Sequence, residues 1–429
     1  MSLSRSTVLL LVAAAALLAS FAIDLHLTRH YAGVDLRDKV VGSRSLLAGR
    51  SLYFDPWRPG EAEELADPML PLGTTLTRYT GTPFQALLMA PLAKMPFGTA
   101  RLAWLIAQYA LLLLALWTTA RAFGPHGPQQ VAVLAGVLML FLAARSWHLH
   151  VERGQVYVIA AAMIAGLFAA VAARREPAVG VLVAALVLLK PTYAVIAAPL
   201  LLVATPRVWL GGGGFLLGTA GVFALLPGGL RAWAEYRTAM QAWSGFIGRG
   251  EPPVTEAVQG AYPATIEGIT GLDGHHPMEF EDGSVTSILY AFGVELPAWA
   301  PWALFAAMAL AVVLIAGRRL RRLPATDLLL LGFCGWTVLM WLLPVPRFDY
   351  QVVHWAAPLA VLLLTHRRRP FAWDLLATIA AALLLGAWPM LPVNVLLAEA
   401  IMVALVAVVL WRRMAQDPVA PDGVRAPVR

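Results

Sequence analysis

Cysteine is almost absent from this chain of 429 residues, whose one thiol belongs to Cys334. A single cysteine inside an apolar run excludes an intramolecular disulfide, a thiolate metal centre and thiol redox chemistry. Charge is also scarce, at 13% of residues against 59% that are hydrophobic. Together with a mean hydropathy of +0.70, this composition excludes an ordinary soluble domain and predicts an all-α polytopic membrane protein.

The formal net charge of +7 does not indicate nucleic-acid binding, because the basic residues form small clusters between apolar runs. Under alternate crossing, these clusters fall on one side of the membrane, which the positive-inside rule identifies as the cytoplasm. The clusters are Arg174–Arg175, Arg318–Arg322, Arg367–Arg369 and Arg412–Arg413. Both termini are therefore expected in the cytoplasm, and the loops 24–100 and 228–295 outside.

The apolar runs predict about twelve membrane-spanning helices. Their ranges are 7–23, 101–122, 129–147, 155–173, 178–190, 192–206, 209–227, 296–316, 325–343, 352–366, 371–389 and 391–411. Runs 178–190 and 352–366 are short for a span of about 20 residues, so merging or tilting would change the count. Residues 1–415 are expected to form a single integral membrane domain, and residues 416–429 a disordered cytoplasmic tail.

Three further segments carry structural expectations. The first run also fits a cleavable signal peptide, but it is just long enough to span, which favours a retained signal anchor. The segment 83–97 suits an interfacial or re-entrant helix better than a span. The run Gly211–Gly214 indicates close helix packing, since no Lys and Ser/Thr follow it as a phosphate loop requires.

The first outer loop begins with an unusual concentration of charge. Its residues 35–54, "DLRDKVVGSRSLLAGRSLYF", must lie in water, at the headgroups or beside a polar cavity, because lipid cannot solvate these groups. A partly desolvated Asp35 would have the affinity for protons that a general base needs. The structural alternative is that Asp35 caps a helix that starts at Leu36 and stops at Gly49.

This loop resembles a known family. Asp35, Gly49, Leu52 and Tyr53 resemble the first-loop signature of the polyprenol-phosphate-mannose-dependent mannosyltransferases, glycosyltransferase family 87, which have the GT-C membrane fold. The later segments "YTGTPFQALLMAPLAKMP", "ERGQVYVIAAAMIAG" and "LLKPTYAVIAAPLLL" are similar to family motifs in the same order. The resemblance covers about residues 30–205. It implies a GT-C-like bundle of about twelve transmembrane helices with two long extracytoplasmic loops.

The resemblance also implies an activity. Such enzymes transfer a sugar, here expected to be mannose, from a polyprenyl-phosphate carrier to a lipid or glycan acceptor with inversion. We therefore expect an integral protein of the bacterial cytoplasmic membrane whose active site faces outward. The partners expected are the lipid-linked donor, a glycolipid or glycan acceptor and membrane lipids. No cofactor is expected, because the donor is a co-substrate.

Individual residues follow from the same resemblance. Asp35 takes the place of the catalytic base, and the expected substrate-binding residues are Asp38, Tyr79, Gln155, Asp349 and Tyr350. Asp38 is also a rival base, coupled to Asp35 on one helix face, or else a member of a solvated network with Arg37 or Lys39. In one departure, Tyr350 and Gln351 of "PVPRFDYQ" stand where the family often has paired histidines. That departure puts the sugar and the acceptor in question more than the reaction type.

Cations are needed at the donor phosphate, because phosphate leaves as an anion and requires positive charge rather than a proton. Residues at the outer ends of separate spans are expected there, namely Lys190, Arg153, Arg347 and His150. The alternative for Lys190 is that it only snorkels toward the headgroups. His148, His150 and Glu152 would line one side of an extended segment, but interfacial histidines beside an acid are commoner than a metal site, so no divalent metal is expected.

Two other functional classes remain open from the sequence. A lipid or glycolipid transporter or flippase also needs a dozen spans, but places binding charges near the bilayer midplane. In this chain Glu399 is the only acid predicted deep in a span, which favours an enzyme. Flux without a glycosidic product would identify a transporter. A noncatalytic scaffold for cell-envelope assembly would leave the Asp35 motif unexplained.

Overall fold

A computed structural model of the chain describes most of its residues. It covers residues 4–30, 32–54, 57–69, 79–124, 127–249, 300–343, 349–365 and 392–415, with Ala381 and part of 284–299. Within these ranges the chain forms α-helices and short 3-10 helices, and no strand. The predicted span 371–389 and tail 416–429 lie outside the described residues, apart from Ala381.

Within the described residues, six helices are long and apolar enough to cross a membrane. They are α1 (Arg5–His30), α4 (Phe97–Phe123), α10 (Pro206–Leu225), α15 (Ala300–Leu320), α16 (Ala325–Leu342) and α19 (Pro392–Ala415). Long apolar helices of this kind satisfy their backbone groups internally, as lipid demands. The chain is therefore a polytopic helical membrane protein, as its composition predicts.

The remaining apolar runs form shorter helices. They are α5 (Pro128–Ala143), α6 (Arg145–Arg153), α7 (Tyr157–Ala172), α8 (Glu176–Leu189), the succession η2 (Pro191–Tyr193), α9 (Ala194–Ala197) and η3 (Ala198–Leu202), and the succession η5 (Asp349–Trp355) and α17 (Ala356–Thr365). The run 129–147, predicted as one span, breaks at Ala144, and α5 and α6 meet there at a bend of 64°. The bend separates an apolar helix from a polar, amphipathic one. If that bent pair counts as one span, the described residues contain up to seven.

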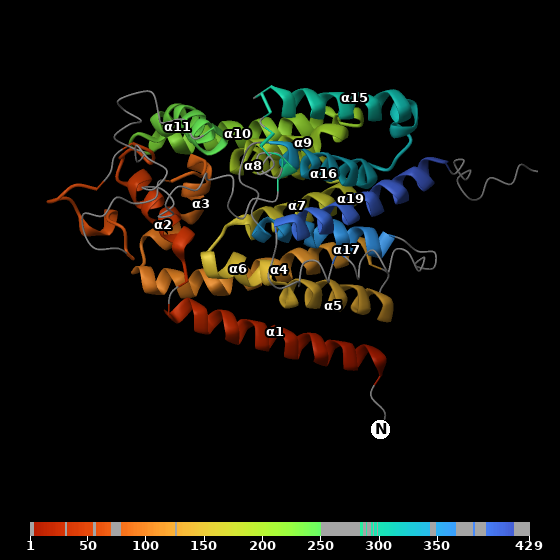
Figure 1. Ribbon diagram of the computed structural model, residues 1–429, viewed down its shortest axis with the longest axis horizontal. Helices are drawn as coiled ribbons and strands as arrows, with labels where there is room; N and C mark the ends of the chain where they lie inside the picture. Colours follow the sequence, from red (N-terminus) through yellow and green to blue (C-terminus); the bar gives the residue numbers. More distant parts are fainter. Residues whose placement is uncertain are drawn as a thin grey trace, which may run out of the picture.

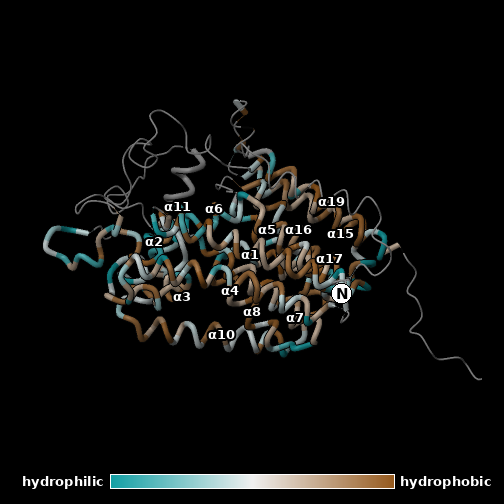
Figure 2. Tube along the Cα trace, turned by 90° about the horizontal axis from the view of Figure 1, so that it is seen from below, coloured by the Kyte–Doolittle hydropathy of each residue, from teal (hydrophilic) through white to brown (hydrophobic). Residues whose placement is uncertain are grey.

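The helices run side by side around a buried centre. In Figure 1, α1 and α15 lie at opposite edges, with α4, α7, α16 and α17 between them. In α16, 67% of the apolar window is buried, against 6% in α10. Leu217 and Leu225 on α10 are 77% and 87% exposed, which is expected of side chains that face lipid. Figure 2 shows hydrophobic residues along the helices and hydrophilic ones gathered at the end that carries α2.

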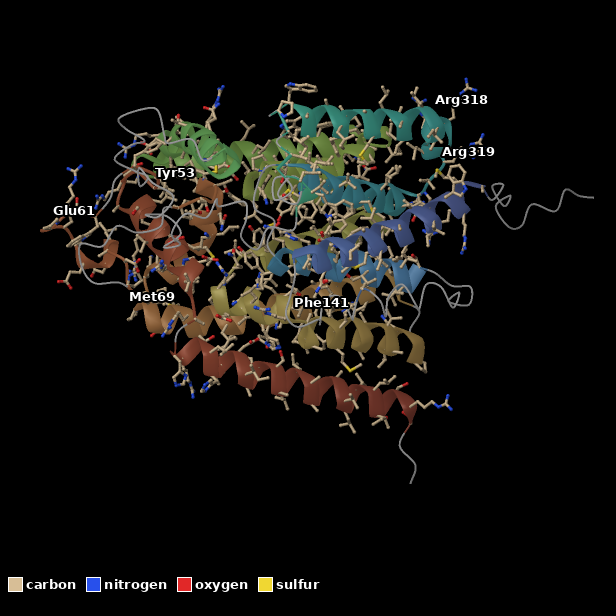
Figure 3. All side chains as sticks on the ribbon, viewed as in Figure 1. Tyr53, Glu61, Met69, Phe141, Arg318 and Arg319 are labelled. Atoms are coloured by element: carbon tan, nitrogen blue, oxygen red, sulfur yellow. The ribbon has the colours of Figure 1, made fainter. Side chains whose placement is uncertain are left out.

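The first long loop and the basic cluster after α15 lie at opposite ends of the bundle (Figure 3). Figure 3 shows Arg318 and Arg319, from the basic cluster after α15, at one end, while Glu61 and Tyr53 from the first long loop lie at the other. This arrangement fits the predicted topology, in which the first loop and the basic clusters lie on opposite sides.

Glycines bring α8 and α10 together, as expected for the run Gly211–Gly214. A Cβ atom added to Gly180 of α8 would lie 1.9 Å from the backbone oxygen of Val208, and one on Gly211 would lie 2.2 Å from that of Pro177. The two backbones therefore approach in a way that only glycine permits. The prediction of close helix packing is confirmed for Gly211 and Gly212, whereas a Cβ atom added to Gly213 or Gly214 would meet nothing within 4 Å.

The first loop forms a compact cap at its end of the bundle. Its helices are α2 (Val34–Leu47) and α3 (Pro83–Ala93), with the turn η1 (Glu63–Leu65) between them. Ser43 of α2 donates a hydrogen bond to the Ala86 oxygen of α3 at 2.7 Å. Arg44 donates to the backbone oxygens of Ala93 and Met95 that follow. The helix expected within 83–97 is α3, which ends at Ala93 and packs on α2, while Phe97 already begins α4.

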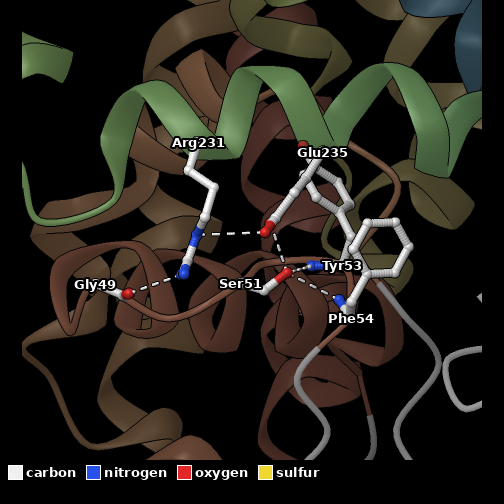
Figure 4. Close-up of polar contacts among 6 residues, drawn as sticks. All are labelled: Gly49, Ser51, Tyr53, Phe54, Arg231 and Glu235. Atoms are coloured by element: carbon white, nitrogen blue, oxygen red, sulfur yellow. Dashed lines mark hydrogen bonds and ion pairs between the residues drawn. The ribbon is translucent and has the colours of Figure 1, made fainter. Parts of the chain in front are cut away.

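The second long loop begins with α11 (Gly229–Arg249), which docks onto the first loop. Ser51 Oγ donates to Glu235 Oε2 at 2.6 Å and accepts from the backbone N–H groups of Tyr53 and Phe54 (Figure 4). Arg231 donates to the Gly49 oxygen at 3.0 Å and pairs with Glu235 at 3.3 Å. These contacts join α11 to the first loop.

One expectation about buried acids is wrong. Asp24, predicted at the start of the first outer loop, lies inside α1 and is 0% exposed. Helix α1 continues to His30, although the sequence after Ile23 becomes polar. Glu399 is also 0% exposed, but it is not the only buried acid in a helix long enough to span.

Candidate active site

Asp35 lies at the start of α2, immediately after a sharp turn in the chain. Gly33, the residue before the helix, has φ +107, a left-handed conformation that favours glycine. Its N–H donates to the Glu152 oxygen at 2.6 Å, which fixes the start of α2 against α6. Asp35 occupies the first turn rather than the N-cap position, and no side-chain cap forms. The capping alternative for Asp35 is therefore wrong.

The end of α2 agrees with the sequence. Gly49 has φ +70, its N–H donates to the Leu46 oxygen, and the Arg50 N–H donates to that of Ser45. This is the Schellman arrangement, in which a left-handed glycine closes a helix. The predicted stop at Gly49 is confirmed. Asp35 and Gly49 thus mark the two ends of a single surface helix.

The Asp35 carboxylate is contacted by two residues that flank a second glycine turn. Gln155 Nε2 donates to Asp35 Oδ2 at 2.5 Å, and Arg153 lies 3.7 Å from the same oxygen. Between them, Gly154 ends α6 with φ +73. A Cβ atom there would lie 2.6 Å from Leu36 Cβ, so glycine allows the turn and the close approach of α2. With a side chain 21% exposed, Asp35 is accessible to a ligand.

Two stacked tyrosine rings lie between Arg153 and a second cation, Lys190. The Arg153 guanidinium lies 5.9 Å from the centre of the Tyr350 ring, and Tyr350 stacks on Tyr157 with centroids 5.9 Å apart and an interplanar angle of 22°. Lys190 Nζ lies 5.6 Å from the centre of the Tyr157 ring. Cation–π attraction favours this order. We call Arg153, Tyr350, Tyr157 and Lys190 the cation–tyrosine ladder.

Four separate elements contribute to the ladder. Arg153 is the last residue of α6, Tyr157 the first of α7, Lys190 the C-cap of α8, and Tyr350 the second of η5. Five residues selected from the sequence therefore come together around one region. They are Asp35, Arg153, Gln155, Lys190 and Tyr350. The arrangement offers a carboxylate that accepts protons and two cations that attract an anion.

A buried histidine supports the inner side of this region, and the sequence did not single it out. The His354 ring lies 5.3 Å from that of Tyr157, edge to face. Its Nε2 shares a hydrogen bond of 2.6 Å with the Tyr193 hydroxyl, and its Nδ1 one of 2.5 Å with the Gln351 oxygen. His354 is 0% exposed. The only sequence signal for it was a histidine within a predicted span, which is costly unless it is paired.

Asp38 has a different environment from Asp35. It is buried, and its Oδ1 accepts no hydrogen bond from the described residues. Burial raises the pKa of the Asp38 carboxyl well above its ordinary value, more than the neighbouring Lys39 lowers it. The solvated network expected with Arg37 is wrong, because Arg37 pairs with Asp67 at 3.0 Å. A carboxyl kept neutral is a poor base, so Asp35 is the better candidate.

The raised pKa of Asp38 predicts a pH-dependent effect of Asp38→Asn on stability. Folding binds a proton at this site, so the wild type loses stability as pH rises above 3.8, the ordinary pKa, by up to about 1.4 kcal/mol per pH unit. Asparagine does not titrate. We therefore expect equal thermal unfolding midpoints in detergent at low pH, and an advantage for the variant that grows as pH rises from 3.8 toward the raised pKa of the folded protein.

The opposite trend would contradict this account. If the wild type gains stability over Asp38→Asn as pH rises, Asp38 is ionised in the folded protein and paired with Lys39. The exposed acid Glu63 provides a matched control, because Glu63→Gln should leave the pH dependence unchanged.

Tyr79 is placed apart from the ladder. It is buried against α2, where a Cβ atom on Gly42 would lie 2.6 Å from its ring. Its hydroxyl donates to the Thr82 oxygen at 2.9 Å, and its ring lies 5.7 Å from Lys39 Nζ. These contacts give Tyr79 a packing role between α2 and α3. They do not favour the substrate-binding role expected for it.

The histidines of α6 do not form the expected alternating set. Because the segment is helical and not extended, His148 and His150 point in different directions. His150 is 0% exposed, stacks on Trp147 with centroids 5.7 Å apart, and has no hydrogen-bond partner among the described residues. This burial does not favour phosphate binding by His150. The described residues contain no group of His, Cys, Asp and Glu able to hold a metal.

The side chains of two expected site residues, Arg347 and Asp349, are not among those that the structure describes. Arg347 lies outside the described residues, and Asp349 begins η5 but its side chain is not described. Tyr350 follows directly and stacks in the ladder. Tyr350, one of the two residues that depart from the family pattern, therefore lies beside Arg153, which contacts Asp35.

Comparison with known protein families gives a match over more than half of the chain. The model described as glycosyltransferase family 87 matches residues 79–346, which is 268 of the 429 residues. The matched range includes Arg153, Gln155, Tyr157 and Lys190, and it ends before Tyr350. It begins after α2, so it does not bear on Asp35. No curated protein sequence matches the chain.

Proposed function

The chain belongs to glycosyltransferase family 87, and from that premise we propose that it transfers a sugar from a polyprenyl-phosphate carrier to an acceptor hydroxyl at the extracytoplasmic face. Family membership and the apolar helices make the chain a membrane glycosyltransferase. The observation that supports the finer proposal is the position of Asp35 beside Arg153 and Gln155, with Lys190 at the far end of the ladder.

In the proposed reaction Asp35 is the general base. The acceptor hydroxyl gives its proton to the Asp35 carboxylate as its oxygen attacks the anomeric carbon. The bond from that carbon to the phosphate oxygen breaks, and its electron pair leaves with the prenyl phosphate. Attack from the face opposite the leaving group inverts the anomeric centre. The hydrogen bond from Gln155 orients the carboxylate for this transfer.

Arg153 and Lys190 are proposed to bind the donor phosphate. Negative charge increases on the phosphate in the transition state, and cations fixed in advance stabilise it without reorganisation. The stacked rings of Tyr157 and Tyr350 hold these cations apart and limit their motion. Tyr350 also replaces a histidine of the family pattern, so it is proposed to take part in the choice of sugar, for which mannose is the first candidate.

A cavity along α8 suits the hydrocarbon part of such a donor. It measures about 480 Å³ and is lined almost entirely by apolar side chains of α8, η3 and α10. Val187 on its wall lies one turn before Lys190, and Glu176 at its other end is the first residue of α8. A prenyl chain whose phosphate is bound at Lys190 would therefore extend along α8 away from the outer face.

Substituting tryptophan for Val183, on the cavity wall, tests this path. We expect the KM for a long-chain prenyl-phosphate sugar to rise about tenfold, because several buried CH₂ groups lose their contacts at about 0.8 kcal/mol each. The KM for a donor with two isoprene units should change by less than about twofold. Steady-state kinetics with both donors gives the comparison.

Leu217→Trp is the matched control, since Leu217 lies on the lipid-facing side of α10, outside the lining residues. An equal rise of KM for both donors, or no rise for either, would place the prenyl chain elsewhere.

The activity itself is tested with purified protein, radiolabelled prenyl-phosphate sugars and lipid or glycan acceptors from the cell envelope. A new glycosidic product, seen by chromatography and mass spectrometry, supports the proposal. Movement of the labelled lipid across vesicles without such a product would instead support the transporter alternative. Comparing mannose with other sugars on the same carrier identifies the donor.

A further inference from the structure

The first helix is attached to the bundle by polar residues. The buried residues of α1 are Ala13, Ser20, Asp24 and Thr28, and the last three, spaced by four, share one face of the helix. Lipid tails are as apolar as leucine, so no hydrophobic force drives helices together in a membrane. Polar contacts on this face, together with the packing of Leu17, Phe21 and Leu25 on the core, therefore fix the outer half of α1.

Asp24 joins three helices through its two oxygens. Its Oδ1 accepts a hydrogen bond from His148 Nδ1 of α6 at 2.7 Å. Its Oδ2 accepts one from the Tyr109 hydroxyl of α4 at 2.6 Å, and that hydroxyl shares a bond of 2.7 Å with Ser20. Asp24 is 0% exposed. An acid buried in a spanning helix is costly to maintain, and such residues usually have a functional role.

Helix α6 is held at both of its ends. Near its start, His148 contacts Asp24, and near its end the Glu152 oxygen accepts the Gly33 N–H at 2.6 Å. The residues that contact Asp35 follow at once, as Arg153 and Gln155. On the other side, α1 continues through Gly33 into α2, whose first turn holds Asp35. The two halves of the Asp35 site are therefore carried by the two helices that Asp24 and His148 connect.

We propose that Asp24 is a positioning residue, whose pair with His148 fixes α6 against α1 so that Arg153 and Gln155 meet Asp35. The proposal deepens the function proposed above and rests on it. A buried ion pair contributes little net stability, because desolvation offsets its attraction, but it specifies one geometry. Misplacing a catalytic group by about 1 Å can cost about a hundredfold in rate.

The test compares Asp24→Asn, His148→Asn and the double variant. We expect each single change to lower kcat per folded enzyme by about ten- to a hundredfold, with the donor KM changed by less than about threefold. The double variant should lose no more than either single one, because both act through one contact. The exchanged pair, Asp24→His with His148→Asp, should recover part of kcat.

A second measurement does not need activity. Hydrogen exchange of the peptide around Gly33 to Arg37 should quicken in each single variant, because the Gly33 N–H bond to Glu152 depends on the position of α6. Asp327→Asn is the matched control, since Asp327 is a buried acid paired with Arg413 near the basic end. It should change neither kcat per folded enzyme nor exchange at this peptide.

An unchanged kcat per folded enzyme in Asp24→Asn, or additive losses with unchanged exchange, would overturn the positioning role. If the wild type transfers no sugar, the proposed function fails, whereas the exchange measurement still decides whether Asp24 orders the start of α2.

Discussion

Asp35→Asn is expected to lower kcat for sugar transfer by about 10²- to 10⁴-fold, the range that a general base contributes. Asparagine keeps the shape of the side chain and can still face Gln155 and Arg153, but it cannot accept the acceptor's proton. Donor binding should change little, because the cations of the ladder remain. Single-turnover rates with purified variant and a saturating prenyl-phosphate sugar measure the effect.

Glu61→Gln is the matched control. Glu61 lies in the same first loop and pairs with Arg50 at 2.8 Å, away from the ladder, so its loss should leave transfer at the wild-type rate. Equal turnover of Asp35→Asn and wild type, in protein with the same unfolding midpoint, would remove Asp35 from the mechanism. The acceptor's proton would then require another base.

The second large effect is expected from the cations of the ladder. Lys190→Met should lower kcat by about 10²- to 10³-fold, because a fixed charge that stabilises a developing anion is worth about 3 to 4 kcal/mol. Arg153→Met should have a similar or larger effect, since it loses the contact with Asp35 as well. Lys190→Arg keeps the charge and should retain most of kcat.

The distinction between kcat and KM decides what these cations do. A rise in donor KM with unchanged kcat would mean that Lys190 binds substrate and transition state equally well. If neither constant changed, Lys190 would not act on the donor. Its ammonium group would then only extend toward the headgroups, as is common for a lysine at a helix end. Arg50→Met, in a loop cation paired with Glu61, controls for loss of positive charge at this end of the molecule.

Much of the fold follows from the sequence. Each predicted span within the described ranges corresponds to a helix or a succession of short helices. In lipid, a single apolar segment can satisfy its backbone hydrogen bonds by itself only as a helix. The end of α2 at Gly49 and the close packing at Gly211 could also be predicted from the sequence, because both require a residue without a side chain. Six helices in the described residues are long enough to span, so the count of twelve remains a prediction.

The site was predictable in its members but not in its arrangement. Asp35, Arg153, Gln155, Lys190 and Tyr350 were each selected from a local motif, and nothing local specifies that they meet. The alternation of His148 and His150 was misleading, because residues i and i+2 share a face in an extended chain but not in a helix. Asp24 was missed because an acid next to an apolar run is normally placed in the loop.

The sequence alone determined the membrane class, the helical runs and the family, because hydropathy and short motifs are local properties of the chain. Only the tertiary structure decided that Asp35 faces Arg153 and Gln155, that two tyrosines separate Arg153 from Lys190, and that Asp24 joins α1 to α6. These are contacts between residues distant in the chain. They depend on how the helices pack, and lipid provides no hydrophobic force from which that packing can be inferred.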